Sequence, residues 1–150
     1  MGEGRQKARS VAIRYLKYRP RSREEVRRRL VREHVDEEVI QETLIELEKE
    51  GWFDDLRLAR EWAEERMRTR GLSLSAIRRE LRRKGIGEEV IEEALSGVVY
   101  DEREVVFSLL SKKAKSGRDD GYLVSLLMRR GYSYEKAKEY VRLWRTGEEV

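Results

Sequence analysis

Few residues of this sequence could take part in catalysis or bind a metal ion. The 150 residues include one histidine, His34, and no cysteine. A catalytic triad, a cysteine nucleophile and a thiolate zinc site therefore all lack the side chains that they need. The aspartate pairs Asp54–Asp55 and Asp119–Asp120 each precede an expected helix, where a carboxylate caps the first turn. No histidine or third carboxylate stands at ligand spacing from either pair, so we expect no enzymatic activity, no metal and no cofactor.

Arginine and lysine gather instead on short helices that end at a turn. Residues 73–95 read SLSAIRRELRRKGIGEEVIEEAL, in which Ile77 and Leu81 lie on one helical face and Gly85 ends the helix. The acidic helix that follows begins with carboxylates, which the helix dipole favours at that end. The basic side chains point away from the apolar face. Groups of this kind on an exposed helix suit the phosphates of a nucleic acid or the carboxylates of a protein.

This unit of basic helix, turn and acidic helix occurs three times. Residues 22–44 and 119–141 repeat the apolar spacing of residues 73–95. The turn falls at His34, Gly85 and Gly131 in the three copies, and a further amphipathic helix precedes each copy. Internal repetition of this kind predicts an all-α fold built from three tandem three-helix repeats. The expected boundaries are a flexible tail over 1–8, repeats over 9–51, 52–97 and 98–146, and a flexible end over 147–150.

Charge alternates along the chain in step with the repeat. Segments 1–32 and 66–84 are mainly basic, segments 36–56 and 88–104 are mainly acidic, and the net charge is +4. This segregation predicts that one sign of charge lies on one side of the array. The alternative is a set of solvated helix faces held by Glu–Arg pairs four residues apart, each worth about 0.2–0.5 kcal/mol. That alternative explains mixed charge well and segregated charge poorly.

The composition also indicates the cellular compartment in which the protein acts. No stretch is apolar and long enough to cross a bilayer, and the first ten residues, MGEGRQKARS, lack the apolar core of a signal peptide. Charged residues make up 43% of the chain. We therefore expect a cytoplasmic protein without a membrane partner. An array with polar outer faces has no need to associate, so we expect a monomer.

A sequence-specific DNA-reading protein is also built from a helix, a short turn and a second helix. In that motif the second helix enters the major groove and presents arginine or amide side chains to the bases. The second helices here read DEEVIQETLIELEKE and GEEVIEEAL, and their carboxylates would be repelled by phosphates. The basic helices, by contrast, could lie along phosphates without reading bases. The charges thus disfavour sequence-specific recognition.

Four motifs follow one another along the chain: SREEVRRRL at 22–30, GWFDDLRLA at 51–59, ELRRKGI at 80–86 and LMRRGYS at 127–133. In order and spacing they resemble the RecX regulatory proteins, which act on the RecA recombinase. The resemblance covers residues 9–145, and His34 departs from it where a glycine recurs in the other turns. It implies tandem three-helix repeats that form an elongated, curved all-α molecule. The family has no catalytic motif that could be carried over.

The resemblance also implies a function. It predicts a protein that binds along the groove of the RecA–DNA filament and limits filament growth and the recombinase and coprotease activities, in DNA repair, recombination and the SOS response. The expected partners are the RecA filament and, non-specifically, single- and double-stranded DNA. Two alternatives stay open: a non-sequence-specific DNA-binding repeat protein, and a helical protein-interaction scaffold without DNA contact.

The residues themselves suggest how such binding would occur. We expect the basic helices to form one basic strip that meets DNA phosphates or an acidic protein surface, and the acidic helices to face elsewhere, toward solvent or basic patches of the recombinase. The strip comprises Arg27, Arg28, Arg32, Arg78, Arg79, Arg82, Arg83, Lys84, Arg129 and Arg130. The acidic faces comprise Glu37, Glu38, Glu42, Glu88, Glu89, Glu92 and Glu93.

Overall fold

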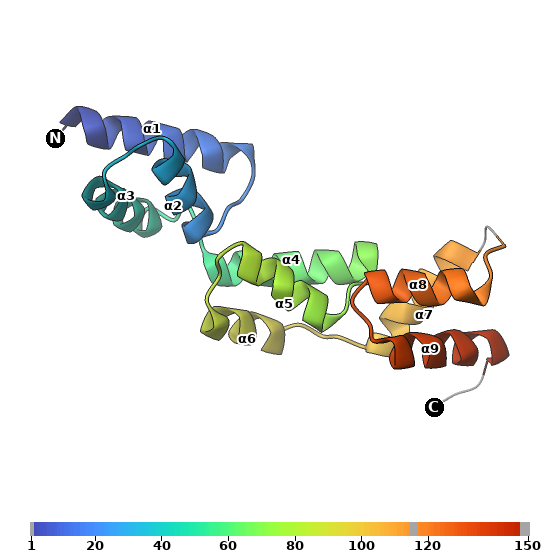
Figure 1. The fold of residues 1–150 in the computed structure, drawn as a ribbon. Helices are drawn as coiled ribbons and strands as arrows, with labels where there is room; N and C mark the ends of the chain where they lie inside the picture. Colours follow the sequence, from blue (N-terminus) through green and yellow to red (C-terminus); the bar gives the residue numbers. More distant parts are fainter. Residues whose placement is uncertain (1, 115–116, 148–150) are drawn as a thin grey trace. The chain divides into compact units, whose positions relative to one another are not determined.

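The computed structural model describes residues 2–114 and 117–147 (Figure 1). These residues form nine helices and no strand, which confirms the predicted all-α helical repeat fold. The last residues of the predicted flexible end, 148–150, and Met1 lie outside the described residues. The helices are α1 (Gly2–Tyr18), α2 (Arg23–Arg32), α3 (Glu37–Lys49), α4 (Asp55–Arg70), α5 (Leu74–Arg83), α6 (Glu88–Ser96), α7 (Glu102–Ala114), α8 (Asp120–Arg129) and α9 (Tyr134–Thr146).

The chain folds into two compact units. The first is made of Met1–Glu61 and Leu81–Gly97, and the second of Trp62–Glu80 and Val98–Val150. Helices α4 and α5 each supply residues to both units. The basic helix α2 therefore belongs to the first unit and the basic helix α8 to the second, while the arginines of α5 are divided between them.

Side-chain caps begin several helices, as the sequence predicts. Ser22 and Glu25 form a capping box at the start of α2. Asp54 accepts a hydrogen bond from the backbone of Arg57 at 3.2 Å, and Asp119 accepts one from the backbone of Tyr122 at 2.8 Å. The first aspartate of each pair is thus a helix cap. Among the described residues, no group of three or more His, Cys, Asp or Glu side chains could hold a metal ion.

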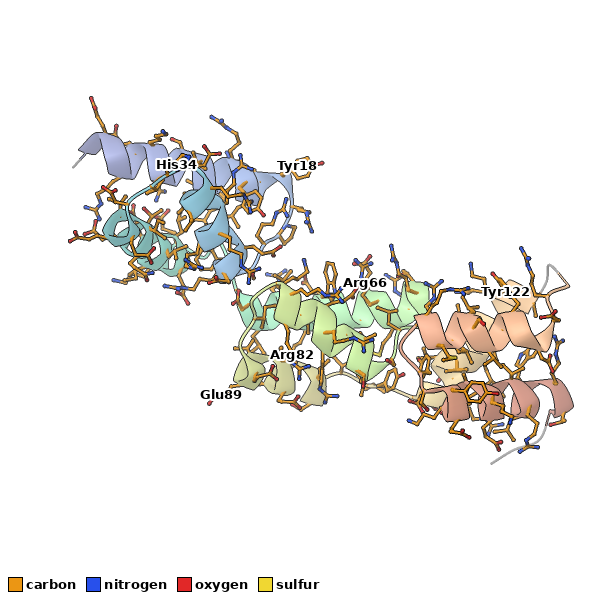
Figure 2. All side chains as sticks on the ribbon, in the orientation of Figure 1. Tyr18, His34, Arg66, Arg82, Glu89 and Tyr122 are labelled. Atoms are coloured by element: carbon orange, nitrogen blue, oxygen red, sulfur yellow. The ribbon has the colours of Figure 1, made fainter. Side chains whose placement is uncertain are left out.

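The three turns that follow the basic helices share one backbone conformation. His34, Gly85 and Gly131 have φ values of 61°, 79° and 102°, in the left-handed region (Figure 2 labels His34). A side chain in this region costs about 1–2 kcal/mol, which glycine avoids. His34 is exposed and tolerates the position. The equivalence of the three turns, predicted from apolar spacing, is therefore present in the backbone itself.

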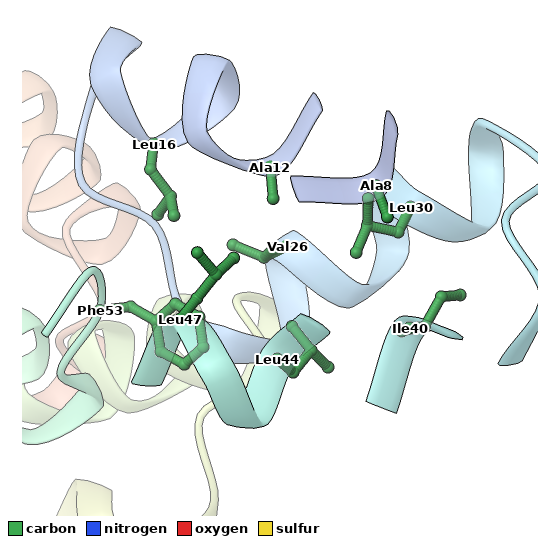
Figure 3. Close-up of a cluster of buried hydrophobic side chains, with 9 residues drawn as sticks. All are labelled: Ala8, Ala12, Leu16, Val26, Leu30, Ile40, Leu44, Leu47 and Phe53. Atoms are coloured by element: carbon green, nitrogen blue, oxygen red, sulfur yellow. The ribbon is translucent and has the colours of Figure 1, made fainter. Parts of the chain in front are cut away.

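The core of the first unit is built from the apolar faces of α1, α2 and α3 (Figure 3). Phe53, from the segment between α3 and α4, closes one side of this core, and Trp52 packs against it. The alanines of α1 contribute little volume, and branched side chains of α2 and α3 fill the remaining space of this core. The buried residues are Ala8, Ala12, Leu16, Val26, Leu30, Ile40, Leu44, Leu47 and Phe53.

The first helix begins earlier than the sequence suggests. We expected a flexible tail over residues 1–8, but α1 starts at Gly2, and Ala8 is completely buried. Ala8 lies one helical turn before the buried Ala12, so the apolar stripe of α1 starts with a residue too small to stand out in the sequence. Arg5 pairs with Glu42 of α3 at 3.2 Å, and Arg9 pairs with Glu50 at 2.6 Å. These contacts fasten the first turns of α1 to α3.

Ala8 provides a direct test of this difference. The variant Ala8→Asp places a carboxylate in the core between α1 and α2, and we expect it to lower the free energy of unfolding by about 2–4 kcal/mol. The matched variant Gln6→Asp makes the same charge change at an exposed position of the same helix and should change it by less than about 0.5 kcal/mol. Urea unfolding followed by circular dichroism measures both. Equal stabilities would show that residues 2–8 do not pack.

The second unit has its own core, formed by α7, α8 and α9 together with Tyr132. Tyr132 donates a hydrogen bond to the carbonyl of Gly71 at 2.9 Å, and its ring meets Tyr140 edge to face. Tyr140 and Trp144 pack against this core. The buried residues are Val106, Leu109, Leu110, Leu123, Leu126, Leu127, Tyr132, Ala137 and Val141.

Candidate functional site

The arginines of α2 differ in how far they are neutralised. Arg27 pairs with Glu24 at 2.6 Å, on the same helix. Arg28 lies 3.5 Å from the same carboxylate, and its Nη1 donates to the backbone carbonyl of Arg83 at 2.8 Å. Arg32 is exposed and makes no ion pair with the described residues. Only the last of the three is thus fully available to a partner.

The basic cluster of α5 is divided between the two units. In the first unit, Arg82, which is labelled in Figure 2, pairs with Glu88 at 2.5 Å across the turn to α6. Lys84 is half-buried 3.7 Å from Glu25, and burial lowers the pKa of its amine. Arg83 is exposed, and its side chain makes no ion pair within the described part of the chain.

In the second unit, the start of α5 contacts the end of α8, and both helices carry residues of the predicted basic strip. Arg78 is half-buried, whereas Arg79 is exposed, and among the residues described it has no ion-pair partner. Arg129 is exposed, with its guanidinium 5.9 Å from the centre of the Tyr122 ring. Arg130 is half-buried, and its backbone carbonyl accepts a hydrogen bond from the amide of Ser73 at 2.9 Å.

Each unit therefore brings some of the predicted strip residues together. Arg28 and Arg83 meet in the first unit through a hydrogen bond, and the helices that carry Arg79 and Arg129 meet in the second. Arg27 and Arg82 are bound by carboxylates of their own unit, and Lys84 is partly removed from solvent. The exposed arginines without ion pairs to described residues are Arg32, Arg79, Arg83 and Arg129.

More carboxylates of the acidic segment around α3 are paired with arginines than the sequence suggests. Glu42, which we expected to face solvent or a partner, pairs with Arg5. Glu46 of α3 and Glu50, which directly follows α3, both bind Arg9. Part of the segregated charge is thus paired between α1 and the acidic segment of α3, whereas the alternative predicted from the sequence places such pairs four residues apart on one helix. Such pairs contribute about 1 kcal/mol or less each at the surface.

Glu24 predicts a pH dependence of stability. The hydrogen bond from Arg27, followed by the nearby charges of Arg27 and Arg28, holds the pKa of Glu24 below its usual value of 4.5. A carboxylate with a lowered folded pKa adds stability above its unfolded pKa, and this stability is lost as the pH falls through the folded value. We expect the free energy of unfolding to decrease as the pH is lowered from 4.5. The variant Glu24→Gln should show a shallower fall in denaturant titrations between pH 5 and pH 2, whereas an identical slope would show that Glu24 makes no stabilising pair.

Two serines that precede basic helices connect these helices to each other. In the first unit, Ser22 Oγ donates to the carbonyl of Lys84 at 2.5 Å. In the second unit, Ser73 Oγ donates to the carbonyl of Gly131 at 3.0 Å. Both serines stand at the same place in the repeat and oppose equivalent turns. The recurrence of a serine at this position of the repeat is the sequence feature that could have indicated a bond between the basic helices.

Two protein-family models match the helices described above. The model of the first three-helix domain of RecX matches residues 8–47, and the model of its second three-helix domain matches residues 54–95. The regulatory protein RecX of Streptomyces coelicolor is 33% identical over 144 residues, which cover 91% of this chain and 77% of that protein. This chain belongs to the RecX family. RecX of Amycolatopsis mediterranei is 34% identical over 147 residues, covering 91% of this chain and 84% of that protein.

Solved RecX structures share the fold. The crystal structure of RecX from Lactobacillus salivarius superposes with a TM-score of 0.78 at 23% sequence identity, covering 97% of this chain and 99% of that one. The two RecX domain models fall on α1–α3 and α4–α6, so the basic helices α2 and α5 are the middle helices of the two domains. None of the helices described is long and apolar enough to span a membrane.

Proposed function

We propose that this RecX protein binds along the RecA–DNA filament and limits its growth, and thereby lowers the recombinase and coprotease activities. Membership of a family of regulatory proteins supports a regulatory role. The basic surface supports a partner that carries phosphates or carboxylates. A filament offers the same site many times, so weak contacts from successive helices add up through effective concentration.

The observation that carries the proposal is the set of exposed arginines on the basic helices. The chain is rich in carboxylates, and several of its arginines are neutralised by them, including Arg9, Arg27 and Arg82. Arg79 and Arg83 are exposed one helical turn apart on α5 without an ion pair to the residues described. Arginines without an ion pair to the described residues are available to a binding partner.

A second candidate is non-specific DNA binding without RecA. The same arginines would suit phosphates. The neighbouring carboxylates Glu24 and Glu88, however, lie within the same helical unit and would weaken attraction to a polyanion. A mixed surface of this kind is better matched to a surface that carries both protein and phosphate charges, such as a nucleoprotein filament.

Titration of the chain into preformed RecA filaments on single-stranded DNA tests the proposal. We expect ATP turnover by RecA to fall as the chain is added, and filament length to stop increasing. Binding to DNA alone, measured in parallel at several salt concentrations, should be weaker and should decline steeply with salt. Unchanged ATP turnover and filament length at saturating chain would overturn the proposal. DNA binding at equal strength with and without RecA would favour the second candidate.

A further inference from the structure

Ser22 makes two hydrogen bonds of different kinds in the first unit. Its Oγ accepts from the backbone N–H of Glu25 at 3.0 Å, which caps α2. The same hydroxyl donates its proton to the carbonyl of Lys84, at the end of α5. Ser22 is completely buried, so water does not compete for either bond. One hydroxyl thus joins the start of one basic helix to the end of the next.

Ser73 repeats this arrangement in the second unit. Its Oγ accepts from the backbone N–H of Ala76 at 3.1 Å and donates to the carbonyl of Gly131 at 3.0 Å. Its own N–H donates to the carbonyl of Arg130 at 2.9 Å. Ser73 is 5% exposed. The start of α5 is therefore fastened to the end of α8 in the way that the start of α2 is fastened to the end of α5.

The glycine turns allow the two helix ends to come this close. A β-carbon at Gly131 would lie 2.7 Å from Cβ of Ala76 and closer still to Oγ of Ser73. A β-carbon at Gly85 would overlap the Cβ and Cγ atoms of Glu24, two residues after Ser22 in the first turn of α2. Each serine therefore faces a glycine turn in the next copy of the repeat. We call each pair a serine–glycine joint, Ser22 with Gly85 and Ser73 with Gly131.

We propose that Ser22 and Ser73 are positioning residues that hold successive basic helices in register for binding. In the first unit the joint lies beside the hydrogen bond from Arg28 to the carbonyl of Arg83, so it fixes these two arginines relative to each other. In the second unit it fixes the helix of Arg79 against the helix of Arg129. A hydroxyl is required because it accepts from its own helix and donates to a carbonyl at once. This inference rests on the proposed function only for what the aligned arginines bind.

Other caps in the chain provide controls. Ser133 caps α9 by accepting from the backbone of Lys136 at 3.2 Å, and no described residue accepts a hydrogen bond from its hydroxyl. Asp119 caps α8 at the position equivalent to Ser22 and Ser73, and a carboxylate can only accept. The variant Ser133→Ala therefore removes a cap without removing a joint, whereas Ser73→Asp keeps a capping oxygen and removes the donor.

The test compares Ser73→Ala, Ser73→Asp and Ser133→Ala in the full chain. Hydrogen exchange by NMR follows the amide of residue 73, which donates to the carbonyl of Arg130. We expect this amide to exchange at least tenfold faster in both Ser73 variants and less than twofold faster in Ser133→Ala. The concentration that halves RecA ATP turnover should rise at least about tenfold in both Ser73 variants, because misaligned contacts no longer reinforce one another. Ser133→Ala should leave it within twofold.

The two readouts separate the joint from the proposed function. Unchanged exchange at residue 73 in both Ser73 variants would overturn the joint itself. Faster exchange with unchanged inhibition, in a chain whose wild type inhibits RecA, would overturn the positioning role. If the wild type does not inhibit RecA at all, the proposed function fails, and the exchange measurement still decides whether the joint exists. Should Ser73→Asp fail to fold, Ser73→Ala against Ser133→Ala makes the same comparison.

Discussion

Replacing Arg79 and Arg83 together by glutamate should raise the concentration that halves RecA ATP turnover by about 100-fold. Both side chains are exposed and have no ion pair with the described residues, so their replacement breaks no ion pair of the described chain. Each reversal both removes an attraction and introduces a repulsion at the proposed contact. About 1.4 kcal/mol per position corresponds to the expected factor. The measurement is ATP hydrolysis by preformed filaments over a titration of the variant.

A matched control makes the same change of net charge elsewhere. Arg14 and Lys17 are exposed on α1, outside the basic strip, and Arg14→Glu with Lys17→Glu should leave inhibition within about threefold. Circular dichroism should show the same helicity for both double variants and the wild type. Equal loss of inhibition in the two double variants would indicate that only overall charge matters. Full inhibition by the Arg79 and Arg83 variant would remove these residues from the interface.

The variant Gly131→Ala should lower the free energy of unfolding by about 3 kcal/mol. Its φ of 102° lies in the left-handed region, where a β-carbon costs about 1–2 kcal/mol, and that carbon would collide with Ser73. Displacement of Ser73 loses a further hydrogen bond, worth about 1 kcal/mol. For a chain of this size the melting temperature should fall by roughly 10 °C. Thermal unfolding followed by circular dichroism measures the change.

His34 supplies the opposite case at the equivalent turn. His34→Gly removes left-handed strain at φ 61° but adds freedom to the unfolded chain, so stability should stay within about 1 kcal/mol of the wild type, on the higher side. One substitution adds a β-carbon at a left-handed turn, and the other removes one at an equivalent turn. A Gly131→Ala variant as stable as the wild type would show that the close approach of α5 and α8 is not required.

The fold class could be predicted because the apolar spacing of the basic and acidic helices is regular. Ile77, Leu81 and Ile91 recur at the expected intervals and are all completely buried. The caps at Asp54, Asp119 and Ser133 likewise follow from residue type and position. Local rules determine these features, so a single sequence is enough to reveal them.

Features that depend on contacts between distant residues could not be predicted in this way. The sequence does not indicate the start of α1, because Ala8 contributes little hydrophobicity and is buried only when α1 packs in one core with α2 and α3. Glu42 is expected from the sequence to face solvent or a partner, yet it pairs with Arg5 of another helix, a contact that exists only when α1 and α3 pack together. The second bond of Ser22, to a carbonyl 62 residues away, leaves no local trace.

Photo-cross-linking from α5 tests the central claim most directly. Ser75 is exposed and lies one helical turn before Arg79, so benzoylphenylalanine at position 75 samples the proposed contact while both arginines remain in place. Irradiation of the chain bound to RecA filaments should give cross-links to RecA or DNA from position 75, and few from the exposed Glu38 position on α3. Cross-links from position 38 and none from position 75 would contradict a filament contact made by the basic helices.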